Sequence, residues 1–102
     1  MIVNNLLIKL KERDNENIAK ARYVLLSMKG KIDVLRDLQV EVDIRHGSSS
    51  YDIMLITKFE TMKDLDSYLI HPLHIEVSRY ISTVLESGAS LCYESKKEYD
   101  KD

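Results

Sequence analysis

Two strand patterns in the middle of the chain, unlike each other, restrict its fold most. In residues 38–45 apolar side chains alternate strictly with polar ones, which is typical of a strand with one apolar and one polar face. In residues 51–59 both parities carry apolar side chains, so we expect that strand to be covered on both faces. The turn HGSSS joins them. Together they predict a hairpin of one edge strand and one central strand.

The first third of the chain predicts a strand followed by a helix. Residues 2–11 form a strand candidate whose even positions are apolar from Leu6 onward. Apolar residues then recur at helical spacing in residues 15–29, behind an Asp-Asn pair that can cap a helix. Gly30 is a natural stop for that helix.

The last third predicts two helical segments and a final strand. Residues 61–69 show an apolar helical face, and Pro72 suits the first turn of a new helix. We expect this second helix to run to about residue 87 and to end at Gly88, before a strand over residues 89–94.

The element order is therefore β-α-β-β-α-β, which predicts an α+β, ferredoxin-like fold with a four-stranded antiparallel sheet. In this topology the first and third strands are central, in agreement with the contrast between the two middle strands. A chain of 102 residues forms one domain, here residues 1–95, and the charged residues 96–102 are expected to be a flexible tail.

Composition limits the kinds of partner and the cellular compartment that we expect for this protein. A net charge of −2, with scattered basic residues, favours neither nucleic acid nor an anionic membrane as a partner. No apolar run approaches the ~20 residues of a membrane span, and the N-terminus does not resemble a signal peptide, so a cytoplasmic protein is expected. The single cysteine, Cys92, is expected to be a small buried apolar residue.

One face of the predicted sheet lacks a cover. Helices in this topology lie on one side, whereas Val3, Leu7 and one apolar set of the third strand lie on the other. A second copy of the same sheet would cover this face, so we expect a homodimer formed through the open sheet face.

The stretch YLIHPLHIEV contains the residues best suited to acid/base or metal-binding chemistry. On a helical wheel His74 falls within the apolar arc of its helix, whereas His71 lies at the helix start. With Tyr68 nearby, His74 could act as an acid/base group, or it could be a core histidine bonded to the backbone. The i, i+3 histidine pair lacks a nearby third ligand, so no metal site and no cofactor are expected.

Several of these motifs together resemble the stress-responsive A/B barrel (Dabb) family. They are Tyr51-Asp52, the FET of residues 59–61 and the Y-x-x-H-P-x-H of residues 68–74. The resemblance implies a dimeric α/β barrel in which two sheets close face to face. In a cyclase of that family the tyrosine and histidine of this motif carry out cofactor-free ring closure. This chain has Asn5 where the family has a histidine, so that position can hydrogen-bond but cannot titrate.

Three functions follow as hypotheses. The first is a dimeric Dabb barrel protein of unassigned role that binds a small molecule in a pocket near Tyr68 and His74, with Asn5 as a further ligand contact. The second is a cofactor-free lyase or cyclase acting on a small carbonyl or polyketide-like substrate, with His74 and Tyr68 as the catalytic acid/base pair. The third, a monooxygenase of the same barrel fold, is least favoured because the chain has no tryptophan and no evident heme ligand.

Overall fold

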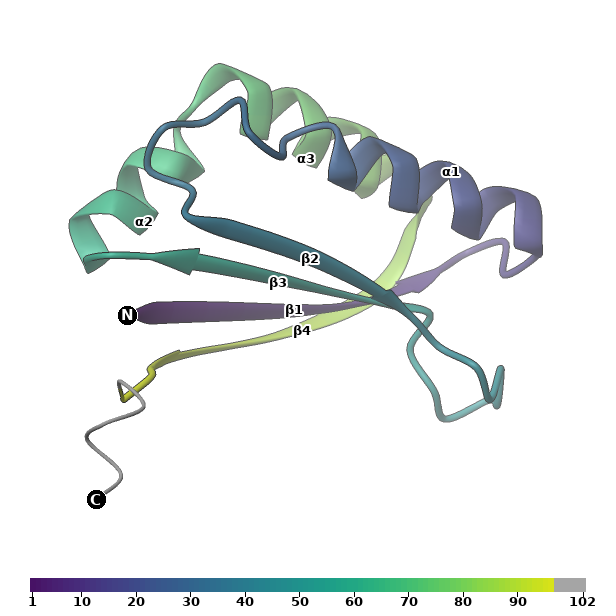
Figure 1. Ribbon diagram of the computed structural model, residues 1–102. Helices are drawn as coiled ribbons and strands as arrows, with labels where there is room; N and C mark the ends of the chain where they lie inside the picture. The colour runs from purple at the N-terminus through teal and green to yellow at the C-terminus, as the bar shows by residue number, and fades with distance from the viewer. Residues whose placement is uncertain (97–102) are drawn as a thin grey trace.

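The computed structural model, which describes residues 1–96, has two layers: a four-stranded antiparallel sheet and three helices that all lie on one side of it (Figure 1). The strand order is β2-β3-β1-β4, so the ferredoxin-like α+β fold with central first and third strands is confirmed. The strands are β1 (Ile2–Leu10), β2 (Asp37–Val42), β3 (Ile53–Phe59) and β4 (Leu85–Glu94). The helices are α1 (Asn15–Leu26), α2 (Met62–Leu69) and α3 (Pro72–Val84).

Each helix begins at a side chain that accepts a backbone hydrogen bond. Asp14 caps α1 by accepting from the Asn17 N–H, and Thr61 caps α2. At α3 the cap is His71, whose Nδ1 accepts from the Leu73 N–H at 3.1 Å, and Pro72 fills the first helical position. The break at His71-Pro72 therefore starts α3, as the sequence indicates.

The two faces of β3 explain its two-sided apolar pattern. Ile53, Leu55, Thr57 and Phe59 are buried beneath the helices, while the intervening side chains are half-buried on the opposite face. The apolar core lies between the sheet and α1, α2 and α3. Burial of these side chains drives folding in proportion to the apolar area that leaves water.

Two helix ends differ from the sequence prediction. The α1 helix ends at Leu26, and the following turn contains Gly30 with φ +75°, a conformation that glycine adopts without strain. The α3 helix ends at Val84 and β4 begins at once, so Gly88 lies inside a strand. A side chain at Gly88 would approach the Leu7 carbonyl oxygen to 3.2 Å, because β4 pairs with β1 there. Close strand contact, rather than a helix end, explains this glycine.

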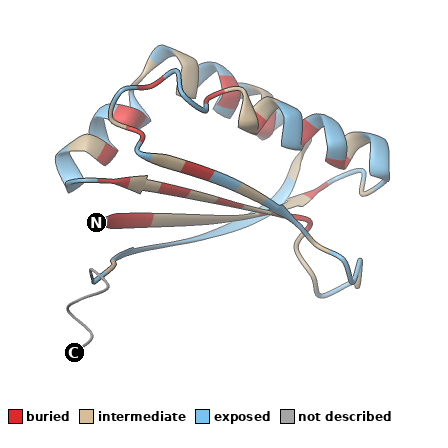
Figure 2. Ribbon diagram, viewed as in Figure 1, coloured by how far each residue is buried: buried red, intermediate tan, exposed pale blue. Residues whose placement is uncertain are grey.

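The expectation that Cys92 is buried is wrong. Cys92 lies on edge strand β4, which is exposed along almost its whole length (Figure 2). The helices pack chiefly over β2 and β3, and so they leave β4 uncovered. Residues 97–102 of the expected tail lie outside the described residues.

A charged pair fastens the loop between β2 and β3. This loop is longer than expected, because β2 ends at Val42 and β3 begins only at Ile53. Asp52 is 1% exposed; its carboxylate accepts from the Leu10 N–H at 2.8 Å and from Arg13 Nε at 3.0 Å. The same guanidinium donates to the carbonyls of Gly47 and Ser50. Arg13 thereby holds both the carboxylate and the loop backbone.

Candidate functional site

Tyr68 lies near the C-terminal end of α2 and is almost fully buried. Its ring contacts that of Phe59, with the centroids 5.0 Å apart, and its hydroxyl faces Met28 Sδ at 3.8 Å. A thioether sulfur is a weak acceptor, so the phenol is held in an apolar setting without a strong partner. Burial therefore raises the pKa of Tyr68 to about 12.

His74, in the first turn of α3, lies directly beside Tyr68, with 4.4 Å between the ring centroids. Its Nδ1 is 3.0 Å from the Leu69 carbonyl oxygen. Because a carbonyl only accepts, Nδ1 carries the hydrogen, and in the neutral ring Nε2 keeps its lone pair. Burial lowers the pKa of His74, helped by nearby His71 and opposed by the Leu69 hydrogen bond, so the neutral ring is favoured.

Two hollows meet at His74. The inner one, about 60 Å³, lies between the sheet and the helices and is lined by Tyr68, His74, Ser78 and mainly apolar side chains. The outer one, about 250 Å³, is a surface groove bordered by His74, Ser78 and Arg79. His74 and Ser78 line both, so these two side chains separate the cavity from the groove.

Asn5 does not belong to this site. Strand alternation places it on the open face of the sheet with Val3 and Leu7, whereas Leu6 points toward the helices and lines the inner cavity. The grouping of Asn5 with Tyr68 and His74 in one pocket is thus corrected, because the sheet lies between them. Asn4 has the parity of Leu6 and is the polar residue of β1 on the helix side. The alternation of Leu6, Ile8 and Leu10 in the sequence already carried this signal.

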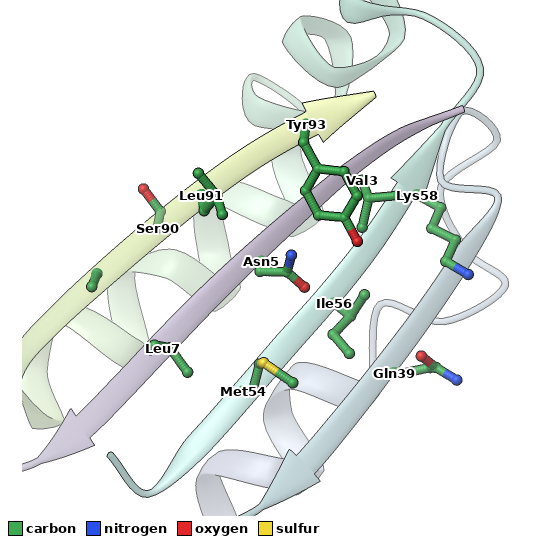
Figure 3. Close-up of a pocket in the computed structure, with 11 residues that line it drawn as sticks. Val3, Asn5, Leu7, Gln39, Met54, Ile56, Lys58, Ser90, Leu91 and Tyr93 are labelled. Carbon is green, nitrogen blue, oxygen red and sulfur yellow. The ribbon is translucent and has the colours of Figure 1, made fainter. Parts of the chain in front are cut away.

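The open sheet face is hollowed as well, on the side of the sheet away from the helices. It has a volume of about 620 Å³ and is lined by side chains from all four strands (Figure 3). Leu91 is 65% exposed and Tyr93 47% exposed on this face, although both are large and apolar. An exposed apolar patch of this kind marks an interaction surface.

Neither a metal cluster nor a membrane span is found in the part of the chain that the structure describes. Within residues 1–96 no group of three or more His, Cys, Asp or Glu side chains could hold a metal ion. None of the helices described there is long and apolar enough to cross a membrane.

Because the Tyr68 phenol is buried, we expect it to ionise only at high pH. The folded state favours neutral Tyr68, so the stability that this provides is complete below pH 10 and is lost as the pH rises toward 12. Followed by the absorbance of tyrosinate, the wild type should show a component that ionises near pH 12, and Tyr68→Phe should lack it. If Tyr68→Phe instead loses a tyrosine that ionises at lower pH and keeps the component near pH 12, the buried setting is contradicted.

Comparison with known proteins supports the fold on independent grounds. The family profile of the Stress responsive A/B Barrel Domain (Dabb) matches residues 2–96. No match is found among curated protein sequences. Several solved structures share the fold at low identity.

A dimeric protein of unknown function and ferredoxin-like fold from Bacteroides fragilis is 23% identical, with a TM-score of 0.78; the match covers 92% of this chain and 95% of that one. A Dabb family protein from Mesorhizobium loti is 16% identical, with a TM-score of 0.78 and 94% and 97% of the two chains covered. The hydroxynitrile lyase of Passiflora edulis is 10% identical, with a TM-score of 0.80 and 94% of each chain covered. At these identities the likeness concerns the fold alone. The family profile, which spans nearly the whole chain, shows that this protein belongs to the stress responsive A/B barrel domain family.

Proposed function

We propose that this protein is a homodimer whose protomers each bind a small organic molecule beside Tyr68 and His74. The dimer is supported by the apolar side chains left exposed on the open sheet face, and structural relatives such as the Bacteroides fragilis protein are described as dimeric. Pairing of two such faces would remove this surface from water and cover the sheet on both sides.

The observation that carries the binding proposal is the state of His74. Its Nδ1–H is engaged by the Leu69 carbonyl, which orients the ring and leaves Nε2 as an acceptor for a ligand. The ring borders both the apolar cavity and the surface groove. A ligand that enters from the groove could hydrogen-bond to Nε2 and place an apolar group toward Tyr68.

The size of the hollows restricts the ligand. A cavity of about 60 Å³ holds only a few non-hydrogen atoms, and the groove of about 250 Å³ is below the ~300–1,000 Å³ typical of drug-sized ligands. The ligand class is therefore small, partly apolar molecules with one or two polar groups.

A cofactor-free lyase or cyclase is the second candidate function, and the paired rings favour it. Neutral His74 has the lone pair that a general base needs, and neutral Tyr68 has a proton to donate near neutral pH. A small carbonyl substrate would have to enter the inner cavity for its oxygen to reach the Tyr68 hydroxyl, which lies against Met28. In that position His74 Nε2 would remove a proton next to the carbonyl.

Thermal unfolding with a panel of small carbonyl compounds tests the proposal. A true ligand at about 100 times its Kd should add about 2.7 kcal/mol to the unfolding free energy and raise Tm. His74→Gln should lose this shift, and Tyr68→Phe should test the contribution of the hydroxyl. His46→Asn is the matched control, because His46 is an exposed loop residue with φ 55°. An equal shift in wild type, His74→Gln and His46→Asn would place the ligand elsewhere.

A further inference from the structure

Asn5 is a polar side chain at the centre of the open sheet face. It lies on the central strand β1, between Val3 and Leu7 along the strand, and opposite Ile56 on β3 and Leu91 on β4 (Figure 3). All four of these neighbours are apolar. The Asn5–Ile56 pair is also the middle one of the seven residue pairs that join β1 to β3.

Among residues 1–96 the structure records no hydrogen bond to the Asn5 side chain. A carboxamide offers two donors and an acceptor, and it loses free energy when it is buried without partners. In a single copy of the chain the half-buried amide can still meet water, but a second sheet packed on this face would remove that water.

We propose that Asn5 hydrogen-bonds to Asn5 of the second copy across the sheet-to-sheet interface and so fixes the register in which the two sheets pair. This inference rests on the proposed dimer through the open face. In a two-fold symmetric interface a residue on the symmetry axis meets its own counterpart, the proposal places that axis at Asn5, and a carboxamide is complementary to itself. The other lining side chains that combine a donor and an acceptor, Gln39, Ser90 and Tyr93, belong to the edge strands β2 and β4, whereas Asn5 belongs to the central strand β1.

The apolar surroundings explain why such a device is useful. Apolar contacts are non-directional, so two apolar sheet faces can pair in several registers of similar free energy. A single buried asparagine pair favours one register, because every other register leaves two amides unsatisfied. Asparagine at one core position selects register in coiled coils in the same way.

Cysteine cross-linking tests whether the two Asn5 side chains face each other. The Cys92→Ser background is needed because Cys92 is exposed. Asn5→Cys in this background should be joined efficiently by a short bis-maleimide cross-linker, because sheets packed face to face lie about 10 Å apart, too far for a direct disulfide. Gln39→Cys, on edge strand β2 of the same face, is the matched control and should cross-link much less.

Substitution of Asn5 by a charged residue tests how much it contributes to dimer stability, with the dimer Kd measured by analytical ultracentrifugation. Asn5→Asp places two carboxylates opposite each other and should raise the dimer Kd about tenfold or more, whereas Gln39→Glu adds the same charge at the edge and should change it little. If Asn5→Cys does not cross-link and Asn5→Asp dimerises like wild type, while Ile56→Glu is monomeric, the role of Asn5 is wrong and the interface stands. If Asn5→Cys does not cross-link, and both Asn5→Asp and Ile56→Glu dimerise like wild type, the open face is not the interface, and the proposed dimer through this face fails as well.

Discussion

Asp52→Ala is expected to lower the free energy of unfolding by about 3 kcal/mol. The carboxylate is 1% exposed and accepts hydrogen bonds from the Leu10 N–H and from the Arg13 guanidinium. Alanine leaves the Leu10 N–H without its acceptor and Arg13 without its counter-charge. We place the loss at the lower end of the range for buried pairs, because the Arg13 side chain is 27% exposed and can recover water.

Chemical denaturation at one fixed protein concentration measures this loss, since dimer formation would make stability depend on concentration. Asp66→Ala is the matched control: Asp66 is an exposed carboxylate on α2, and its removal should change stability by less than about 0.5 kcal/mol. Asp52→Asn keeps an acceptor for Leu10 and should lose less than the alanine variant. A loss below about 1 kcal/mol for Asp52→Ala would show that the hydrogen bonds of Asp52 to Arg13 and Leu10 contribute little to stability.

Ile56→Glu is expected to convert the dimer into a folded monomer, with a Kd raised about 100-fold or more. Ile56 lies on central strand β3, and its side chain lines the open face. In the proposed interface the glutamate would be buried without a partner, which costs several kcal/mol. In a single protomer the same side chain would reach water, so the fold itself should persist.

Sedimentation equilibrium measures the Kd, and circular dichroism checks the fold. Ile44→Glu is the matched control, because Ile44 is 90% exposed in the loop after β2, away from the open face. It introduces the same charge and should leave the dimer intact. Equal Kd values for the wild type and both variants would show that the copies pair through another surface.

Strand order and layer arrangement could be predicted because periodicity reports burial. The strict alternation before the HGSSS turn and the two-sided apolar pattern after it identified β2 as an edge strand and β3 as a central one. Those patterns depend on which face meets the core, a property that each residue carries locally. The start of α3 followed in the same way from the local geometry of Pro72.

The candidate site was only half accessible from sequence. Tyr68 and His74 are six residues apart and lie beside each other because the chain turns at His71-Pro72, which local signals indicate. Asn5 was grouped with them from a family motif, although the side chains of a strand alternate between faces. One position of difference in register moves a side chain to the other side of the sheet, and the apolar alternation of Leu6, Ile8 and Leu10 already indicates that Asn5 points away from the helices.

The sequence by itself thus determined the element order, the fold class and the family, because these depend on periodicity and on short motifs. The tertiary structure decided that Cys92 is exposed, that Gly88 lies in a strand, and that Arg13 and Asp52 meet across 39 positions of the chain. These features depend on contacts between segments far apart in sequence, and a contact of this kind leaves no periodic trace in either segment. The meeting of cavity and groove at His74 belongs with them, because it exists only once α3 is packed against the sheet.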